Sequence, residues 1–363
     1  MNLPTNTYHF EFLTPAWAGG ASPAETAEVR IATLRGHLRQ WLRLLYPGQR
    51  MDEEIFGRLA GEGRNAQAAS SRVLLQLEKP VQSVITKNLV GYTGRRDERD
   101  ALQDPESYFL WPLRTQSRGV LMPGAATDFT LRVRWYPSPV NRINRPESKL
   151  GNAIQALGLL GNIGTRATRG YGSLWEKGRD FANEDQLREA LHFLPNTIQV
   201  RLLDGSFDDV RRALAAAARW MRSYRVGSAT YGTTTPEAVN DHDVADPAQT
   251  ASVQAVVYRH ALGMPLSQRF NRGRDTSTVQ SKHRHDGTET DRYPSPLRIK
   301  VIRMGGKCRV LVVLLRGLLL PVGTRITLSN RPTRTAELRH DLLNQMMASG
   351  LARSHECSLP SPA

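Results

Sequence analysis

The chain has 363 residues, of which only two are cysteines, and its formal net charge is +15 with an isoelectric point near 10.3. So few cysteines exclude a disulfide framework and a cysteine-based zinc site, and no apolar run reaches the ~20 residues that cross a bilayer. The positive charge predicts a polyanionic partner, and nucleic acid is the first candidate.

The first half of the chain predicts one ferredoxin-like unit. Its elements follow in the order strand, helix, strand, strand, helix and strand, which is the β-α-β-β-α-β order of that fold. In chain order they cover residues 7–13, 25–46, 72–78, 129–136, 146–160 and 171–175, with a glycine-rich loop before the last strand and polar insertions over residues 49–71 and 91–106.

The second half predicts a similar unit without a repeated sequence. Strands are expected over residues 197–203, 252–260, 297–303 and 308–315, and helices over residues 207–224 and 335–348. Ser206 and Asp209 have the spacing of a capping box for the first of these helices. The polar, basic stretch 267–296 predicts a mobile loop.

The fold class predicted from these patterns is α+β: two tandem ferredoxin-like (RRM-like) domains with antiparallel sheets and long insertions. The expected boundaries are residues 1–178 for the N-terminal domain with the glycine-rich loop, residues 179–351 for the C-terminal domain with the basic insert 267–296, and residues 352–363 for a frayed tail.

The glycine-rich loop is the strongest candidate for a binding site. Its glycines allow positive φ angles, so that successive amides can point at an anion, while Arg166 and Arg169 offer planar donors for phosphate and Tyr171 offers a ring for a base. The candidate residues are Gly161, Asn162, Gly164, Arg166, Arg169, Gly170, Tyr171 and Gly172. The alternative is a plain connector between a helix and a strand. A dinucleotide fingerprint is disfavoured because the loop follows a helix, and no P-loop sequence is present.

Arg35, Arg39 and Arg43 form a second candidate, at spacing i, i+4 and i+8 on the first predicted helix. Like charges at this spacing destabilise a helix by a few tenths of a kcal/mol per pair, and no acid lies between them. The pattern therefore predicts phosphate binding, with a solvated helix face as the alternative.

Other polar groups predict neither a metal site nor a cofactor. His283 with His285, and Asp241 with its neighbours, lack a convincing metal-ligand spacing and are expected in surface loops. No catalytic triad or carboxylate pair stands out. His37, beside the arginines, keeps open the alternative of a general acid or base in RNA cleavage.

Three segments give the chain a family resemblance. Residues 12–21 (FLTPAWAGGA) resemble a strand-end motif, residues 34–41 (LRGHLRQW) a first-helix motif, and residues 164–174 (GTRATRGYGSL) the glycine-rich loop of the RAMP superfamily of CRISPR proteins. Thr168 stands where that family commonly has arginine, and residues 295–300 (SPLRIK) are similar to a C-terminal strand. Within the superfamily, the chain resembles the first subunit of type III-B Cmr effector complexes.

The resemblance implies a cytoplasmic, non-catalytic RNA-binding subunit at the head of a guide-RNA complex in antiviral defence. Its implied partners are crRNA, near the 3′ region, target RNA, and other Cmr or RAMP subunits, with no membrane contact. Two alternatives stay open at this point: a metal-independent endoribonuclease that processes crRNA precursors, and an assembly subunit whose basic faces contact protein.

Overall fold

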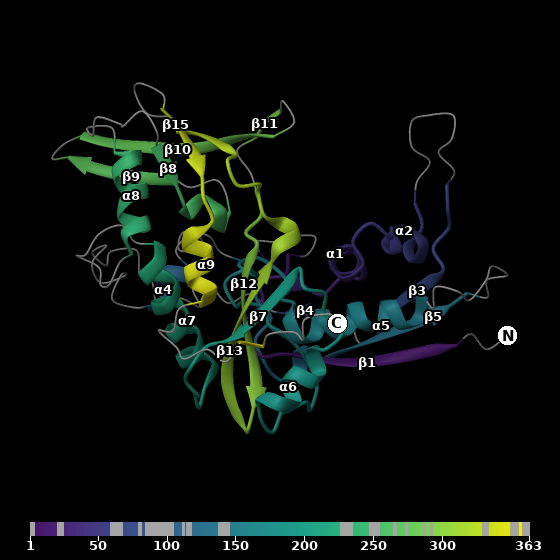
Figure 1. Ribbon diagram of the computed structural model, residues 1–363. Helices are drawn as coiled ribbons and strands as arrows, with labels where there is room; N and C mark the ends of the chain where they lie inside the picture. Colours follow the sequence, from purple (N-terminus) through teal and green to yellow (C-terminus); the bar gives the residue numbers. More distant parts are fainter. Residues whose placement is uncertain are drawn as a thin grey trace.

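The structure is a computed structural model (Figure 1). It describes residues 4–19, 25–58, 68–78, 82–83, 105–110, 113, 118–136, 146–225, 235–246, 255–263, 267–272, 275–285, 288–290, 293–328, 334–348 and 356–357. None of the helices in these ranges is long and apolar enough to span a bilayer.

Helices and strands are interspersed along the chain. The α-helices are α1 (Ile31–Leu45), α2 (Met51–Phe56), α4 (Pro105–Leu110), α5 (Pro146–Leu160), α6 (Glu184–Leu191), α7 (Val210–Arg225), α8 (Pro236–Ala245) and α9 (Asp341–Ala348), and the 3-10 helices are η2 (Ala125–Thr127), η5 (Arg259–Leu262) and η6 (Arg316–Leu318). The strands are β1 (Thr5–Phe12), β2 (Ala27–Glu28), β3 (Val73–Glu78), β4 (Gln82–Ser83), β5 (Phe129–Trp135), β6 (Leu174–Glu176), β7 (Ile198–Leu202), β8 (Ala255–Val257), β9 (Ser267–Arg272), β10 (Asp275–His285), β11 (Thr288–Thr290), β12 (Leu297–Met304), β13 (Lys307–Leu315), β14 (Arg325–Leu328), β15 (Arg334–Leu338) and β16 (Glu356–Cys357).

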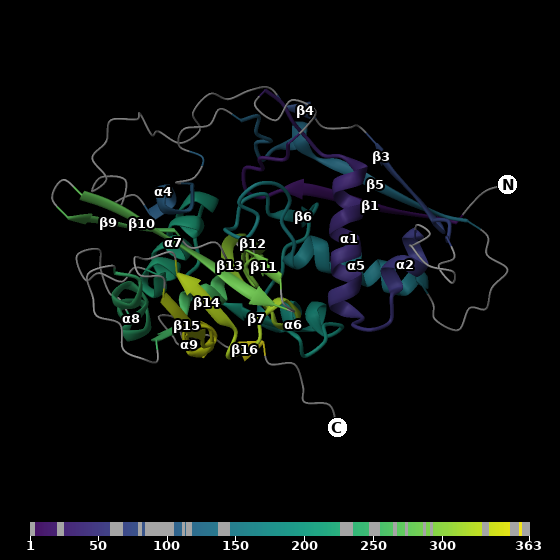
Figure 2. The same cartoon turned by 90° about the horizontal axis from the view of Figure 1, so that it is seen from above.

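The first sheet is antiparallel, with the strand order β3-β5-β1-β6. Helices α1 and α5 lie along one of its faces (Figure 2). In α1 the predicted apolar stripe is confirmed, because Leu34, Leu38, Trp41, Leu42 and Leu45 are all buried. Residues of β5 alternate between buried and half-buried, as expected for a strand with one face on the core.

The second sheet is also antiparallel, with the order β12-β13-β7-β16. Numbered within each group of four strands, both sheets read 2-3-1-4 across, so the two halves share one topology despite different sequences. A tight hairpin joins β12 to β13, and Gly305 and Gly306 supply the positive φ angles, 59° and 70°, that this turn requires.

The hydrophobic core crosses the predicted boundary at residue 178. One cluster joins Phe12 and Trp41 of the first half to Phe181, Val200 and Val313 of the second. The opposite face of the second sheet packs on α7 and α9 in another cluster. The second sheet is therefore covered on both faces, by its own helices and by the N-terminal half.

The basic insert forms strands and not the mobile loop that its composition predicted. β9 pairs with β10, and β10 pairs with β11 and β14, in a six-stranded sheet that also contains β15 and β8. Hydrogen bonds between the backbones of these strands stabilise the ribbon, which has few apolar residues to bury. Figure 1 shows the ribbon extending past α8 at the upper left.

Three further expectations on the second half are corrected. The stretch 335–348 is not one helix, because β15 occupies its start and α9 its end. Within the stretch 252–260, the described residues 255–260 form the short β8, which pairs with β15 in the third sheet, and the start of η5. Helix α7 begins at Val210 and not at Phe207, which instead forms an isolated β-bridge with Cys308. The helix is capped by Asp209, whose Oδ1 accepts a hydrogen bond from the Arg212 amide at 2.8 Å.

In the tail, β16 pairs with β7, so residues 356–357 are part of the second sheet and are not frayed. The remaining tail residues and residues 91–104 of the expected insertion 91–106 lie outside the described part of the chain, and residues 105–106 begin α4.

Candidate nucleic-acid interface

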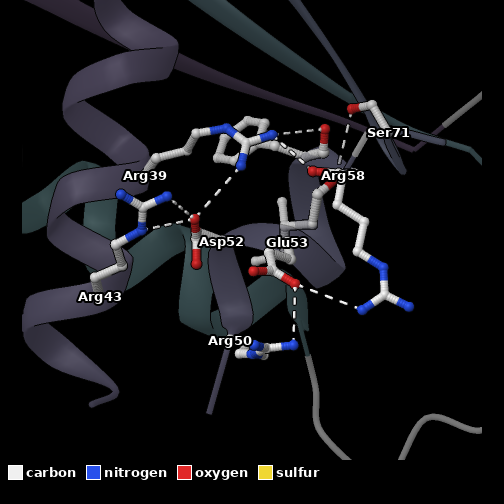
Figure 3. A network of polar contacts seen from close by, with 10 residues as sticks. Arg39, Arg43, Arg50, Asp52, Glu53, Arg58 and Ser71 are labelled. Atoms are coloured by element: carbon white, nitrogen blue, oxygen red, sulfur yellow. Dashed lines mark hydrogen bonds and ion pairs between the residues drawn. The ribbon is translucent and has the colours of Figure 1, made fainter. Parts of the chain in front are cut away.

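Two of the three arginines on α1 are neutralised by a carboxylate from the next helix (Figure 3). Asp52 of α2 lies 3.4 Å from Arg39 and 2.7 Å from Arg43, and its side chain is 4% exposed. Arg39 also donates to the carbonyls of Phe56 at 3.0 Å and Gly57 at 2.7 Å. The inference that an absent anion must relieve this repulsion is therefore wrong for Arg39 and Arg43, because the relieving acid lies outside the helix.

Arg35 differs from the other two. Its side chain is exposed and makes no ion pair with any described residue. It lies one helical turn before Arg39, which Asp52 neutralises, and it remains available to a ligand.

The glycine-rich loop between α5 and β6 is packed against the protein, and its glycines serve that packing. A Cβ on Gly172 would lie 1.9 Å from the Ile163 carbonyl oxygen, one on Gly164 would lie 2.7 Å from that of Trp17, and one on Gly170 would lie 2.7 Å from Leu214. A Cβ on Gly161 would likewise collide with its own helix, 2.5 Å from the Leu157 oxygen. The glycines thus permit close approach of chain segments.

Many amides of this loop already have acceptors within the protein. The amides that donate to carbonyls or to the Thr14 hydroxyl are those of Gly161, Ile163, Thr165, Arg169, Gly172 and Ser173. The amides of Gly161 and Gly172 are therefore not free to bind phosphate, which corrects the expected open cradle at these two glycines.

Asn162 and Tyr171 are buried, each 1% exposed, and they hold the loop in place. The Asn162 amide donates to the Ile299 carbonyl at 2.7 Å and accepts from the Ser173 hydroxyl at 3.0 Å. The Tyr171 ring packs edge-on against Trp17, with centroids 5.1 Å apart. Neither can face RNA in this conformation, so the base-stacking role expected of Tyr171 is wrong.

The loop arginines meet a third arginine that the sequence reasoning missed. Arg166 donates to the Phe109 carbonyl of α4 at 2.6 Å from a left-handed backbone, φ 66°. Arg169 is 8% exposed. Its burial, and then the charges of Arg225 and Arg166, lower its pKa to about 9. Burial and the charge of Arg225 also lower the pKa of Arg166. We call Arg166, Arg169 and Arg225 the loop arginine cluster.

Among the described residues, no carboxylate contributes to the pKa shifts of Arg166 and Arg169. The nearby Asp241 is already bound: it accepts from the Tyr258 amide at 2.8 Å and the Arg259 amide at 2.6 Å, and pairs with the Arg259 side chain at 3.3 Å. Asp241 is thus a structural anchor for η5, and the loop arginine cluster keeps its positive charge. The signal for Arg225 in the sequence was the arginine-rich C-terminal end of the α7 segment.

Lys300 of β12 is a second residue that sequence reasoning did not single out. It is 0% exposed and its Nζ donates to the carbonyls of Gly161, at 2.7 Å, and Leu174. Its Nζ also lies 5.8 Å from the centroid of the Trp175 ring. Burial lowers the pKa of Lys300 well below its ordinary value. A single strand of the second sheet thereby holds both ends of the glycine-rich loop.

His37 of α1 is uncharged at neutral pH. Burial, and then the charge of Arg298 on β12, lower its pKa to about 4. A histidine in this state does not supply the protonated acid that RNA cleavage at neutral pH requires.

The two predicted arginine groups do not come together. α1 contacts α2, whereas the loop arginine cluster lies by α4 and the end of α7, and both views separate α1 from these helices (Figures 1 and 2). In the described part of the chain no three histidine, cysteine or acidic side chains lie close enough to hold a metal ion.

The family model of the RAMP superfamily matches residues 9–175, the segment from β1 to β6. No curated protein matches the chain. Among solved structures, the crystal structure of apo Cmr1 from Pyrococcus furiosus matches with a TM-score of 0.56 at 13% identity, over 98% of this chain and 99% of that one, which shows a shared fold. A type III-B Cmr-beta structure bound to cognate target RNA matches with a TM-score of 0.48 at 11% identity, over 87% of this chain and 94% of that one.

Proposed function

Residues 9–175 of this chain belong to the RAMP superfamily, and on that premise we propose that the protein is a non-catalytic RNA-binding subunit of a type III-B Cmr effector complex. It would hold the crRNA 3′ region, target RNA or both at the head of the complex, in the cytoplasm, beside other Cmr subunits. The shared fold with Cmr1 over nearly the full length of both chains supports this proposal, as do the same βαββαβ order and strand order in both halves, which we interpret as two ferredoxin-like units.

The loop arginine cluster is the observation that carries the proposal. Arg166, Arg169 and Arg225 lie close enough for the charge of Arg225 to lower the pKa values of the other two; Arg166 and Arg225 are half-buried, Arg169 is buried, and no carboxylate of the described residues contributes to these shifts. Gathering like charges at low dielectric is unfavourable unless an anion shares the site. A phosphate of RNA between Arg166 and Arg225 would relieve this repulsion, with Arg169 raising the positive potential from behind.

The positive charge of the whole molecule supports the same conclusion. At +15, long-range attraction to a polyanion is strong and independent of base sequence. Guide and target would supply sequence specificity by pairing, while the protein reads backbone charge and shape.

The experiment is RNA binding by the full-length protein with Arg166, Arg169 and Arg225 all changed to alanine. We expect affinity for single-stranded RNA to fall at least about tenfold, and the slope of log K against log salt to shrink by about 0.7 per lost phosphate contact. Removing three exposed arginines, Arg188, Arg212 and Arg325, changes net charge equally and is the matched control. An unchanged salt slope in a folded cluster variant would refute this site.

The non-catalytic part of the proposal needs its own measurement. The pKa of His37, lowered to about 4, argues against the endoribonuclease alternative. Wild-type protein incubated with repeat RNA and a chelator should leave the RNA intact. Defined cleavage that disappears in the His37→Ala variant would instead establish the enzyme.

A further inference from the structure

Unpartnered donors gather where the middle of α1 meets β12, away from the loop arginine cluster. Arg298 is 9% exposed and its guanidinium lies 5.7 Å from the centroid of the Trp41 ring. The Nε of Arg298 and the Nε1 of Trp41 are both buried without a hydrogen-bond partner. Because both groups are donors, what this position lacks is an acceptor.

The same position also lacks a negative charge. Arg298 makes no ion pair with any described residue, and burial lowers its pKa to about 10. A cation–π contact returns less free energy than burying a guanidinium costs. His37, one turn before Trp41 on α1, feels the charge of Arg298, and no carboxylate is among the groups that perturb its pKa.

Gly36 provides an independent sign of a ligand. It lies inside α1, where glycine is unfavourable relative to alanine, yet a Cβ at this position would meet no atom within 4 Å. Packing against the described residues therefore does not require glycine here. A group that approaches the helix backbone beside His37 would require it.

We propose that Gly36, His37 and Arg298, here called the α1–β12 cluster, bind a phosphate group of RNA, while the buried Trp41 supports the Arg298 guanidinium from within the core. The proposal rests on the proposed function for the source of that phosphate. The guanidinium fork of Arg298 matches phosphate oxygens bidentately, the imidazole gives a further nitrogen, and the absent side chain of Gly36 leaves room for the approach.

The test is an NMR titration of the His37 ring in the full-length protein, assigned with the His37→Gln variant. The probes are inorganic phosphate and two single-stranded RNAs, with and without a terminal phosphate. Phosphate beside the ring should raise the His37 pKa by about one unit. An equal rise with both RNAs identifies an internal phosphodiester as the ligand, and a rise with the phosphorylated RNA alone identifies a terminal phosphate.

Two variants keep the proposal falsifiable. Gly36→Ala adds a Cβ into open space and should fold at least as well as wild type, yet weaken phosphate binding at this position about threefold or more. Arg298→Met should abolish the rise, and Arg325→Met, which removes an exposed charge, should leave it intact.

Gly36→Ala binding phosphate as tightly as wild type, or no rise in the wild-type His37 pKa with any probe, would overturn the proposal. Loss of RNA binding in the loop arginine variant with the His37 response retained would separate the two sites. A wild-type protein that binds inorganic phosphate at His37 but no RNA would contradict the proposed function and the RNA source of the phosphate.

Discussion

Buried cations without carboxylates are the distinctive residues of this protein. Arg169, Arg298 and Lys300 are each at most 9% exposed, and none of them forms an ion pair with a described acid. Ordinary proteins bury such groups only when they are paired. Lys300 has a structural explanation in its two carbonyl acceptors, whereas Arg169 and Arg298 fit a role in holding an external anion.

Replacing Lys300 by methionine tests the structural role. The carbonyls of Gly161 and Leu174 would lose their donor, and we expect the free energy of unfolding to fall by about 1–3 kcal/mol. Urea denaturation measures the change. Lys307→Met is the control, because the Lys307–Asp208 pair is exposed and should contribute little to stability. A Lys300→Met protein as stable as wild type would show that the clamp contributes nothing.

At the scale of elements, α1 and α2 show that the charge pattern of one helix does not reveal the acids that a neighbouring helix supplies. The spacing of the α1 arginines was visible in the sequence, but Asp52 lies nine residues beyond Arg43, in a segment predicted to be a soft surface insertion. Only the turn at residues 46–50 brings this carboxylate back onto α1. Charge balance is therefore a property of the packed pair and not of the helix alone.

Changing Asp52 to asparagine tests its ion pairs with Arg39 and Arg43. With the carboxylate gone, Arg39 and Arg43 repel each other, and we expect a loss of about 1–3 kcal/mol in unfolding free energy. Thermal and urea unfolding measure it. Glu53→Gln is the matched control, since Glu53 meets Arg50 and Arg58 only at 3.8 and 3.6 Å on the surface.

The same variant separates a structural from an RNA-binding role for these arginines. RNA affinity of Asp52→Asn should stay within about twofold of wild type if Arg39 and Arg43 are structural, because two arginines freed onto an RNA path would strengthen binding. A marked gain in affinity would restore the phosphate-binding role predicted from their spacing.

Element prediction succeeded where apolar periodicity is long and unbroken. The α1 stripe, the alternation in β5 and the apolar strands β12 and β13 all lie as expected. It failed for β9, β10 and β15, whose residues have little apolar patterning. These strands are fixed by pairing with neighbours, which no local window of sequence reveals.

At the scale of the whole molecule, the two halves pack as one body around shared cores. His37, between α1 and the second sheet, is largely buried as a result, and His260, a residue of η5, is buried within the second half. Burial and neighbouring arginines lower their pKa values to about 4 and about 3. Both imidazoles are therefore neutral in the folded protein at neutral pH.

This enclosure predicts instability in acid. Below a pH of about 6.5 the unfolded chain binds protons at both histidines while the folded protein does not, so stability is full above that pH and falls as pH decreases toward 4. Each histidine should cost about 2 kcal/mol at pH 5. Urea midpoints at pH 7 and pH 5 measure the loss.

The His37→Gln variant should remove part of that pH dependence, while His192→Gln, at an exposed position, should leave it unchanged. A wild-type protein equally stable at both pH values would contradict the enclosure of these rings.

The sequence by itself determined the strongly basic charge, the order of β1, α1, β3, β5, α5 and β6, the α1 stripe and the place of Arg166 and Arg169 in a glycine-rich loop. These follow from local periodicity and composition. The tertiary structure decided which charges meet: Asp52 neutralises Arg39 and Arg43, Arg225 joins the loop arginines, Lys300 clamps the loop, and Arg298 reaches His37. Such contacts join residues from 9 to more than 250 positions apart. Electrostatic energy depends on distance and burial in space, so a sequence pattern can propose the charged groups but not their partners.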